Sequence, residues 1–457
     1  MTRYDLRDMA ATTASPRLGT RSPTGCDTFD YAAGQPNIFM LMNFKQLLVE
    51  EHGLERAFEL YRRTVSRHCD TTLDLRPLES HYAFSRARGD PFIEVSPAGE
   101  PFTIMPPAVI GAGDHRPLIN TTRSFYVACL TDARVRGRSS VTEVAGTALA
   151  DYQGVELERI DDELEFDSSV FHRDGKRIWM ISEERDVRQI NTAFSLLGCR
   201  TDFFGDWLSE SIPKYVAATL PGRLPPVPVL IDADMPRTHR QALEAMLLPG
   251  AEVIEVPAFD TVEVARLWSA SSLGYMPFHQ KFNERFKWDY LMNSPQRFFP
   301  VRREMLRRAD LVLGAERGPS RVFLARKSFR HRKLVNHVEI EAIAAARGFG
   351  IVYTEDFDFI EQVRLLRHAR FVVGPEGSSF FLNVFMGCDV RMCILNHTFT
   401  EGLVSYNSGA ELINMELTII TGPRVGPQRG SPQDVDYTID PEVFRRFLDD
   451  WLAADAS

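Results

Sequence analysis

Short apolar runs alternate with amphipathic segments over the last third of the chain. The apolar runs have the length and composition of buried strands, and the segments between them repeat their apolar positions with a helical period. The predicted strands are 321–325, 350–354, 371–374 and 390–395, and the predicted helices are 336–347, 359–369 and 380–386. Strands that alternate with helices in this way predict a parallel sheet covered by helices, as in a Rossmann-like half-sheet.

The middle of the chain predicts a second unit of this kind. Its predicted helices are 204–220, 237–248 and 262–269, and its predicted strands are 227–232 and 253–256. Upstream, the pattern changes to short strands separated by turn residues, at 93–95, 102–105, 124–130, 140–144 and 178–181. Residues 39–65 have helical spacing that Gly53 interrupts, which predicts a helix pair with one apolar face. The fold class is therefore α/β.

The most informative stretch is 371–383, where a buried strand runs through a small-residue turn straight into a helix. In a parallel sheet this turn lies at the carboxyl end of a strand, where ligands bind, and the new helix directs unpaired N–H groups outward. Gly374 and Gly377 permit close backbone approach or positive φ, while Ser378 and Ser379 can cap the helix or bind a ligand oxygen. The turn favours a phosphate or another anion, although many such turns in α/β domains bind nothing.

A basic cluster precedes the turn by about one strand–helix–strand unit. Its members are Arg326, Lys327, Arg330, His331, Arg332 and Lys333. Guanidinium groups suit phosphate oxygens, and the alternative is a solvated loop. Asn336 and Glu339 have the spacing of a helix start, so each either caps the helix or contacts a ligand.

With these motifs the chain resembles glycosyltransferase family 61, in particular its bacterial members of the capsular and exopolysaccharide type. That family carries an Arg-rich patch, an Asn at a helix start and a Gly-rich strand-turn-helix in this order. The matching residues are Arg326, Arg332 and Asn336 on the patch, and Gly374, Gly377, Ser378 and Asn383 on the turn. Residues 202–208 resemble the family's aromatic-rich helix start near the active cleft. The chain departs from the family at three positions, with Asp206 and Glu376 where His is common and His337 where Glu is usual.

The resemblance implies a GT-B-like architecture, in which two Rossmann-like domains face each other across a cleft behind an N-terminal helical and β-rich extension. The expected divisions are a flexible tail at 1–35, a helical hairpin with a small β-rich subdomain at 36–185, an N-terminal acceptor domain at 186–310 and a C-terminal donor domain at 311–457.

The resemblance also implies an inverting glycosyltransferase that moves a hexosyl or pentosyl group from a nucleotide sugar, expected to be UDP-linked, to a glycan or lipid-linked glycan in cell-surface polysaccharide synthesis. The expected donor-binding residues are Arg326, Lys327, Arg332, Asn336, Gly374, Gly377, Ser378, Ser379 and Asn383. Asp206 is the first candidate for the base that deprotonates the acceptor, and Glu376 is the second. Because these positions depart from the family, a second hypothesis stays open: a catalytically inactive sugar-nucleotide-binding or scaffold protein of polysaccharide assembly.

Composition indicates which partners the protein can bind and in which cellular compartment it is expected. The 457 residues carry a net charge of −9, which argues against general affinity for nucleic acids. The six cysteines form no CxxC pair and are expected to be reduced thiols. The first 30 residues are polar and no apolar run reaches about 18 residues. We therefore expect a cytoplasmic protein without a transmembrane segment, for which peripheral membrane contact stays open.

One short acidic motif could hold a metal ion. Asp232, Ala233 and Asp234 form a DxD triplet, by which one class of sugar transferases holds a divalent ion. Asp234 comes just before Pro236 at a predicted helix start, so a helix-capping role is favoured. Since cationic side chains and a helix N-terminus can neutralise a leaving diphosphate, we expect no metal and no cofactor besides the nucleotide-sugar co-substrate. The aromatic stretch 275–300 either stacks on sugar rings or belongs to the core.

Overall fold

The computed structural model consists of two compact units, residues 1–72 and residues 73–457. The described residues are 45, 48–65, 71–111, 117–150, 164, 167, 169–183, 187–271, 273–274, 294–314, 316–327, 332–398, 414–428 and 434–456. The predicted tail at 1–35 and most of the aromatic stretch 275–300 lie outside them.

The first unit contains the predicted helix pair in part. Residues 48–52 are helical, and α3 (Leu54–Val65) follows directly. Gly53 separates them with a left-handed φ of 73°, a conformation that glycine adopts without a steric penalty. The predicted interruption at Gly53 is confirmed.

The C-terminal part of the second unit is a parallel sheet of six strands in the order β16-β15-β17-β18-β19-β4, and every neighbouring pair is parallel. The strands are β15 (Arg321–Ala325), β16 (Gly350–Tyr353), β17 (Phe371–Pro375), β18 (Arg391–His397), β19 (Glu416–Gly422) and β4 (Ala108–Ile110). The four strands predicted here are confirmed. The short strand β4 comes from far upstream and pairs with β19, which the sequence pattern did not predict.

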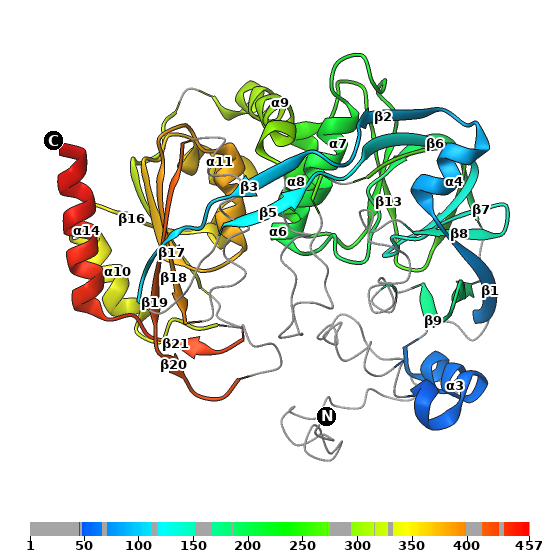
Figure 1. The fold of residues 1–457 in the computed structure, drawn as a ribbon, viewed down its shortest axis with the longest axis horizontal. Helices are drawn as coiled ribbons and strands as arrows, with labels where there is room; N and C mark the ends of the chain where they lie inside the picture. The colour runs from blue at the N-terminus through cyan, green and yellow to red at the C-terminus, as the bar shows by residue number, and fades with distance from the viewer. Residues whose placement is uncertain are drawn as a thin grey trace. The chain divides into compact units, whose positions relative to one another are not determined.

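Helices cover both faces of this sheet (Figure 1). On one face α10 (His337–Ala345) and α14 (Pro441–Ala456) pack on alternate strand residues such as Phe323 and Phe371. On the other face α11 (Phe359–Arg367) packs on the intervening residues, among them Val322 and Val372. The alternation follows from the period of two along each strand, and it gives the predicted helix-covered parallel sheet.

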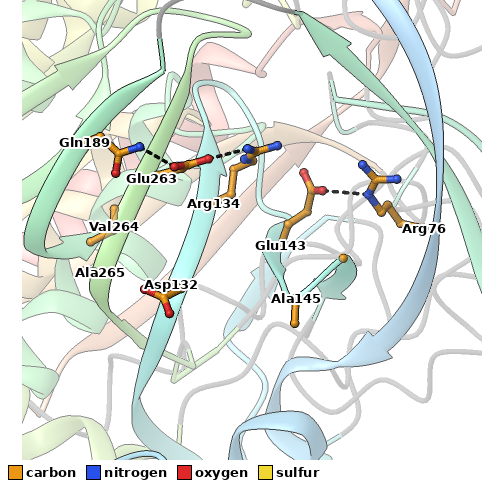
Figure 2. A pocket seen from close by; sticks show the side chains of 10 residues that line it. Arg76, Asp132, Arg134, Glu143, Ala145, Gln189, Glu263, Val264 and Ala265 are labelled. Carbon is orange, nitrogen blue, oxygen red and sulfur yellow. Dashed lines mark hydrogen bonds and ion pairs between the residues drawn. The ribbon is translucent and has the colours of Figure 1, made fainter.

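The other large sheet is mixed and has eleven strands, in the order β13-β12-β11-β14-β6-β7-β8-β1-β10-β9 with β2 paired to β6. Its strands are β1 (Thr71–Ser80), β2 (Phe92–Ser96), β6 (Phe125–Arg136), β7 (Thr142–Val144), β8 (Thr147–Ala150), β9 (Val170–Asp174), β10 (Arg177–Glu183), β11 (Arg188–Ser195), β12 (Val229–Asp232), β13 (Val253–Val256) and β14 (Thr261–Ala270). The strands β13, β12, β11 and β14 are parallel, and β6 pairs antiparallel with β14. Figure 2 shows polar side chains from several of these strands on one face of the sheet.

The helix predicted at 262–269 is wrong, because these residues belong to β14 (Thr261–Ala270). This strand pairs along its length with β6 on one side and β11 on the other. Partners distant in sequence thus decide its conformation, and its local pattern does not. In consequence β14 joins the parallel strands of this sheet to its large antiparallel part. The predicted Rossmann-like unit is therefore one part of a larger mixed sheet.

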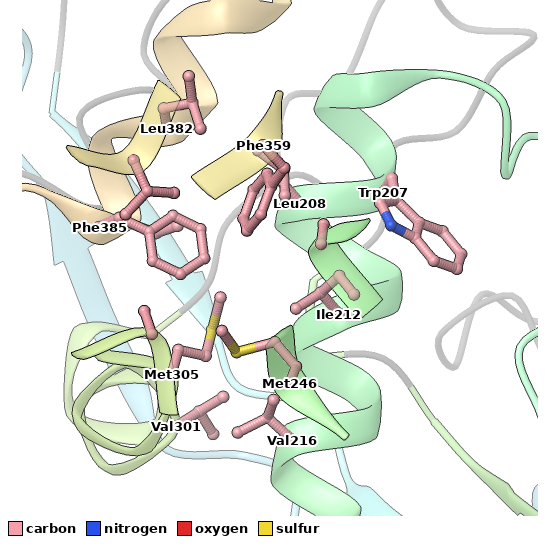
Figure 3. Close-up of a cluster of buried hydrophobic side chains, with 14 of the residues drawn as sticks. Trp207, Leu208, Ile212, Val216, Met246, Val301, Met305, Phe359, Leu382 and Phe385 are labelled. Atoms are coloured by element: carbon pink, nitrogen blue, oxygen red, sulfur yellow. The ribbon is translucent and has the colours of Figure 1, made fainter. Parts of the chain in front are cut away.

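Helices between the two sheets share one apolar core. They are α6 (Phe204–Asp206), a π-helical turn η2 (Trp207–Ser211), α7 (Ile212–Ala218), α8 (Arg237–Met246), α9 (Pro295–Leu313), α11 and the 3₁₀ helix η6 (Ser378–Phe385). Figure 3 shows the centre of this core, where Leu208, Met246, Met305, Phe359 and Phe385 come together. The helix predicted at 380–386 is a 3₁₀ helix that begins two residues earlier.

Buried arginines of α9 tie the helices together. Arg308 donates to the backbone carbonyl oxygens of Met246 and Thr219, at 2.5 and 3.2 Å. Arg302 donates to the carbonyl oxygen of Met386, just after η6. Buried carbonyl groups at helix ends need such donors, so α9 connects α7, α8 and η6.

The remaining elements are short. They are α4 (His81–Arg88), the pair β3 (Pro101–Ile104) and β5 (Leu118–Thr121), the 3₁₀ turn η5 (Thr354–Asp356), and the pair β20 (Arg424–Val425) and β21 (Asp436–Tyr437). Among the helices that the structure describes, none has both the length and the apolar composition needed to cross a bilayer.

Candidate functional site

The Gly-rich turn lies at the carboxyl end of β17, as predicted. Gly377 is the residue before η6, and it makes no side-chain capping contact. Ser378 and Ser379 are therefore the first two residues of η6 and not its caps. Ser378 is exposed and Ser379 is partly exposed, so both lie where a ligand could reach the start of the helix.

Gly374 permits a close backbone approach, one of the two roles expected of it. A Cβ atom at this position would lie 2.3 Å from the carbonyl oxygen of Leu324 on β15. The glycine therefore permits the close approach of β17 to β15, within the sheet. The structure thus gives Gly374 a packing reason that needs no ligand.

Two predicted arginines converge on Glu376. Nη1 of Arg332 lies 2.8 Å from Oε2 of Glu376, and Nη1 of Arg326 donates to the backbone carbonyl oxygen of Glu376 at 3.2 Å. The Glu376 side chain is only 9% exposed, so this ion pair is poorly screened by solvent. A Cβ atom on Gly377 would lie 3.8 Å from the Arg326 guanidinium. Two guanidinium groups thus lie beside the N-terminus of η6, an arrangement that favours an anion.

Tyr437 lies beside these three residues and was not predicted. Its hydroxyl donates to the carbonyl oxygen of Leu395 at 2.7 Å. Complete burial, with a smaller contribution from the charge of Glu376, raises the pKa of Tyr437 far above its ordinary value. The phenol therefore stays neutral and supports the cluster from the interior of the sheet.

Three other predicted donor-binding residues, Lys327, Asn336 and Asn383, have contacts of their own. The Lys327 ammonium pairs with Asp356, and its side chain is half exposed. The Asn336 amide bonds the backbone of Ile439 in both directions, at 2.8 and 3.2 Å. It precedes α10 but makes no capping contact, so the capping alternative for Asn336 is wrong. Asn383 is 6% exposed within η6.

Asp206 lies on the other predicted segment, at the end of α6. It is 7% exposed, and its Oδ2 lies 3.5 Å from Nη1 of Arg200. No hydrogen-bond donor reaches Oδ2 among the residues that the structure describes. The π-helical turn η2 begins at the next residue, Trp207, and such turns are rare and frequent at functional sites. The segment therefore offers a buried carboxylate oxygen with spare accepting capacity.

Arg200 positions this carboxylate and was not predicted from the sequence. Its Nη2 also lies 3.1 Å from Oε2 of Glu210, and its side chain is 7% exposed. Arg200 thus links two acids of α6 and η2 to the loop after β11. The signal that could have found it is the small-residue run Gly198–Cys199 after a parallel strand, the same kind of signal as the turn at 374–379.

The two predicted segments meet at Gly205. A Cβ atom on Gly205 would lie 2.8 Å from Cδ2 of Phe381 and 3.6 Å from the Ser378 hydroxyl oxygen. The start of α6 therefore packs directly on the start of η6, although 173 positions separate Gly205 from Ser378 (378 − 205). Asp206 and the Gly-rich turn thus belong to one region of the molecule.

The DxD triplet joins loops and does not cap a helix. Asp232 is fully buried and accepts hydrogen bonds from the backbone N–H groups of Arg138 and Gly198 and from the Thr201 hydroxyl. The residue before α8 is Pro236, without a side-chain cap, so the predicted capping role of Asp234 is wrong. Within the described part of the chain, no three His, Cys, Asp or Glu side chains are grouped to hold a metal ion. The expectation of metal independence stays a prediction.

Burial shifts the pKa values of the groups around this loop junction. Burial is the main cause that raises the pKa of Asp232 to about 6 and lowers the pKa of His239 to about 4. Burial also raises the pKa of Asp202, although the positive charge of Arg138 lowers it in part. His239 lies against Phe204 and Trp207, and its backbone carbonyl oxygen accepts from the Trp207 indole at 2.9 Å. Asp232 and His239 are therefore both largely uncharged near pH 5.

These two shifts have opposite effects on stability. His239 is neutral in the folded protein down to about pH 4 but protonates near pH 6.5 when unfolded, so acidification across this window costs about 3 kcal/mol. Asp232 takes up a proton near pH 6 when folded but near pH 3.8 when unfolded. The same acidification therefore raises the free energy of unfolding by about 3 kcal/mol through Asp232. We expect the two contributions to cancel in the wild-type protein.

Replacing Asp232 with asparagine is expected to expose the His239 contribution. Relative to wild type, the free energy of unfolding of Asp232→Asn should fall by about 3 kcal/mol more between pH 6.5 and pH 4. Urea unfolding at several pH values measures the difference, and all other carboxylates cancel in it. His239→Gln should shift in the opposite direction, and profiles of both variants parallel to that of wild type would contradict the assignment.

A family model described as Glycosyltransferase 61 matches residues 204–393, less than half of the chain. The match begins at the start of α6 and ends within β18, so it contains both Asp206 and the Gly-rich turn. No curated protein is significantly similar to the chain. The match supports the resemblance that the motifs indicate, and with it a glycosyltransferase activity that involves a sugar donor and an acceptor.

Proposed function

We propose that the protein is an inverting, metal-independent glycosyltransferase with a GT-B-like division of labour. The parallel sheet would bind a nucleotide sugar, expected to be UDP-linked, and the mixed sheet would present a glycan or lipid-linked glycan acceptor. A role in the synthesis of a capsular or other cell-surface polysaccharide follows from the family resemblance. The single observation that carries the proposal is the packing of Gly205 on Ser378 and Phe381, because it brings a buried acid next to the turn that we assign to the donor diphosphate.

The donor diphosphate is assigned to the Gly-rich turn. The amides at the start of η6 and the guanidinium groups of Arg326 and Arg332 supply positive charge where the leaving group develops negative charge. Glu376 holds Arg332 in place before the donor arrives, so the cation is pre-organised. Lys327 remains a contributor in the proposal, since its pairing with Asp356 is exposed and weak.

Asp206 is assigned as the base. In the proposed step the acceptor hydroxyl gives its proton to Asp206, and its oxygen attacks the anomeric carbon from the face opposite the leaving nucleotide. The electron pair of the broken bond goes to the diphosphate oxygen, whose charge the turn neutralises. The spare accepting capacity of Oδ2 supports this role, and Arg200 keeps the carboxylate oriented.

A binding screen tests the function. Isothermal titration calorimetry of the full chain against nucleoside diphosphates and nucleotide sugars, with and without EDTA, should find a nucleotide sugar whose affinity EDTA does not change. Binding that EDTA abolishes would contradict metal independence. A screen in which no nucleotide binds would contradict the transferase proposal as a whole.

A further inference from the structure

A row of polar side chains crosses the mixed sheet far from the candidate transfer centre. Gln189 of β11 faces Glu263 of β14, Glu263 faces Arg134 of β6, and Arg134 faces Glu143 of β7. Hydrogen bonds join Gln189 to Glu263 and Arg134 to Glu263, and Nε of Arg76 lies 3.2 Å from Oε2 of Glu143 (Figure 2). The row thus runs over five strands that are scattered along the sequence.

The row lines a hollow of about 400 Å³. This volume is within the range of sites that bind small molecules. The strand neighbours of the row, among them Val135, Val144 and Val262, are buried in the apolar core on the other face of the sheet. The hollow is therefore an open polar surface on a rigid support.

The hollow is distinct from the transfer centre. Gln189 lies near the amino end of β11, whereas the loop that carries Arg200 follows the carboxyl end at Ser195. The six residue steps between Gln189 and Ser195 span roughly 20 Å at the rise of an extended strand. A ligand in the hollow would not occupy the turn at Gly377.

The lining of the hollow carries charges of both signs. It contains the carboxylates of Asp132, Glu143 and Glu263 and the guanidinium groups of Arg76 and Arg134. The buried Arg136 bonds the other oxygen of Glu143 from outside the lining, and Asp74 pairs with Arg76 at 3.0 Å. Hydrogen bonds from Arg134, and then from Gln189, lower the pKa of Glu263 and keep it an acceptor at neutral pH. An anion would meet three carboxylates, and a cation would meet two guanidinium groups. A neutral ligand rich in hydroxyl groups can use both the donors and the acceptors.

Asp132 provides an independent indication of a ligand. It has a left-handed φ of 53° although the ladder continues on both sides, from Thr131 to Arg266 and from Ala133 to Val264. It is exposed at the hollow, and its carboxylate has no hydrogen-bond or ion-pair partner within the described ranges. Non-glycine residues in left-handed conformations are uncommon, and they cluster at active sites and ligand-binding sites.

We propose that this hollow is a second carbohydrate site, which binds a neutral oligosaccharide segment through Asp132, Gln189 and the paired side chains of the row. Planar carboxylate, amide and guanidinium groups would bond the ring hydroxyls of the ligand. The site goes beyond the proposed transfer reaction, because its occupancy requires neither the donor nor Asp206. It would hold a glycan on the protein independently of turnover.

Calorimetry of the full chain against cellohexaose, laminarihexaose, maltohexaose and an anionic oligogalacturonate, without nucleotide, tests the proposal. At least one neutral hexasaccharide should bind. Asp132→Gly should weaken that binding by about tenfold, the loss expected for a hydrogen bond to a charged group, and Gln189→Ala by about threefold to tenfold, the loss expected for a neutral one. Glycine suits the left-handed backbone, so Asp132→Gly preserves the fold. Asp389→Gly is the matched control, because Asp389 is another exposed aspartate with a left-handed φ, of 59°.

The outcomes separate this proposal from the transferase. The titration contains no nucleotide, and Arg332→Ala should bind the hexasaccharide as wild type does, so a failure of donor binding leaves the result unaffected. Absence of binding to all three neutral glycans, preference for the oligogalacturonate, or equal affinity in Asp132→Gly and the Asp389→Gly control would each overturn the second carbohydrate site.

Discussion

Replacing Asp206 with asparagine is expected to lower turnover by about two to four orders of magnitude, the contribution typical of a positioned general base. Asparagine keeps the size of the side chain but cannot take a proton at neutral pH. Arg200 would retain Glu210 as a partner at 3.1 Å, so the helix start should stay folded. The assay is the release of nucleotide from the bound nucleotide sugar, with donor affinity measured separately by calorimetry.

Glu376→Gln is the matched comparison, because Glu376 is the second candidate for the base and is buried to the same extent as Asp206. Its carboxylate pairs with Arg332, so the expected loss is mainly in donor affinity. A variant Asp206→Asn that keeps full turnover, together with a Glu376→Gln variant that loses it, would move the base to Glu376. If both variants kept full turnover, neither acid would be the base.

Gly374→Ala is expected to destabilise the parallel sheet by about 3 kcal/mol or more. The added methyl group would lie 2.3 Å from the carbonyl oxygen of Leu324, and neither strand can retreat without breaking ladder hydrogen bonds. The effect should appear in urea unfolding as a lower midpoint with an unchanged slope.

Gly350→Ala is the control for this substitution. Gly350 lies in the same sheet, on β16, and an added Cβ would approach no atom closer than 3.7 Å. Alanine should be neutral there or stabilise the strand by up to about 1 kcal/mol. Equal effects of the two substitutions would show that the contact with Leu324 is not what requires glycine at position 374.

The sequence predicted the parallel sheet well because its strands are short, apolar and buried on both faces. β15 has the bounds that its apolar run indicates, and the Gly-rich turn follows β17 as expected. In such strands the local pattern and the tertiary environment agree.

Prediction failed where distant partners decide the structure. Residues 262–269 have apolar positions that also suit a helix, but β6, more than a hundred residues upstream, pairs with them as a strand. The contact between Gly205 and Phe381 has the same character, since no local signal indicates it. The roles of Arg200 and Asp232 depend on loops that meet only in the folded chain.

Donor binding by Arg332→Ala is the most direct test of the assignment of the diphosphate to the Gly-rich turn. The control is Arg391→Ala, because Arg391 is as exposed as Arg332 (24% against 25%) and pairs with Glu416 at a similar distance, 2.9 Å, at the other end of the strands. The account predicts that Arg332→Ala weakens the affinity for the nucleotide sugar by about tenfold to a hundredfold while Arg391→Ala leaves it unchanged. Unchanged affinity in Arg332→Ala, or equal losses in both variants, would contradict it.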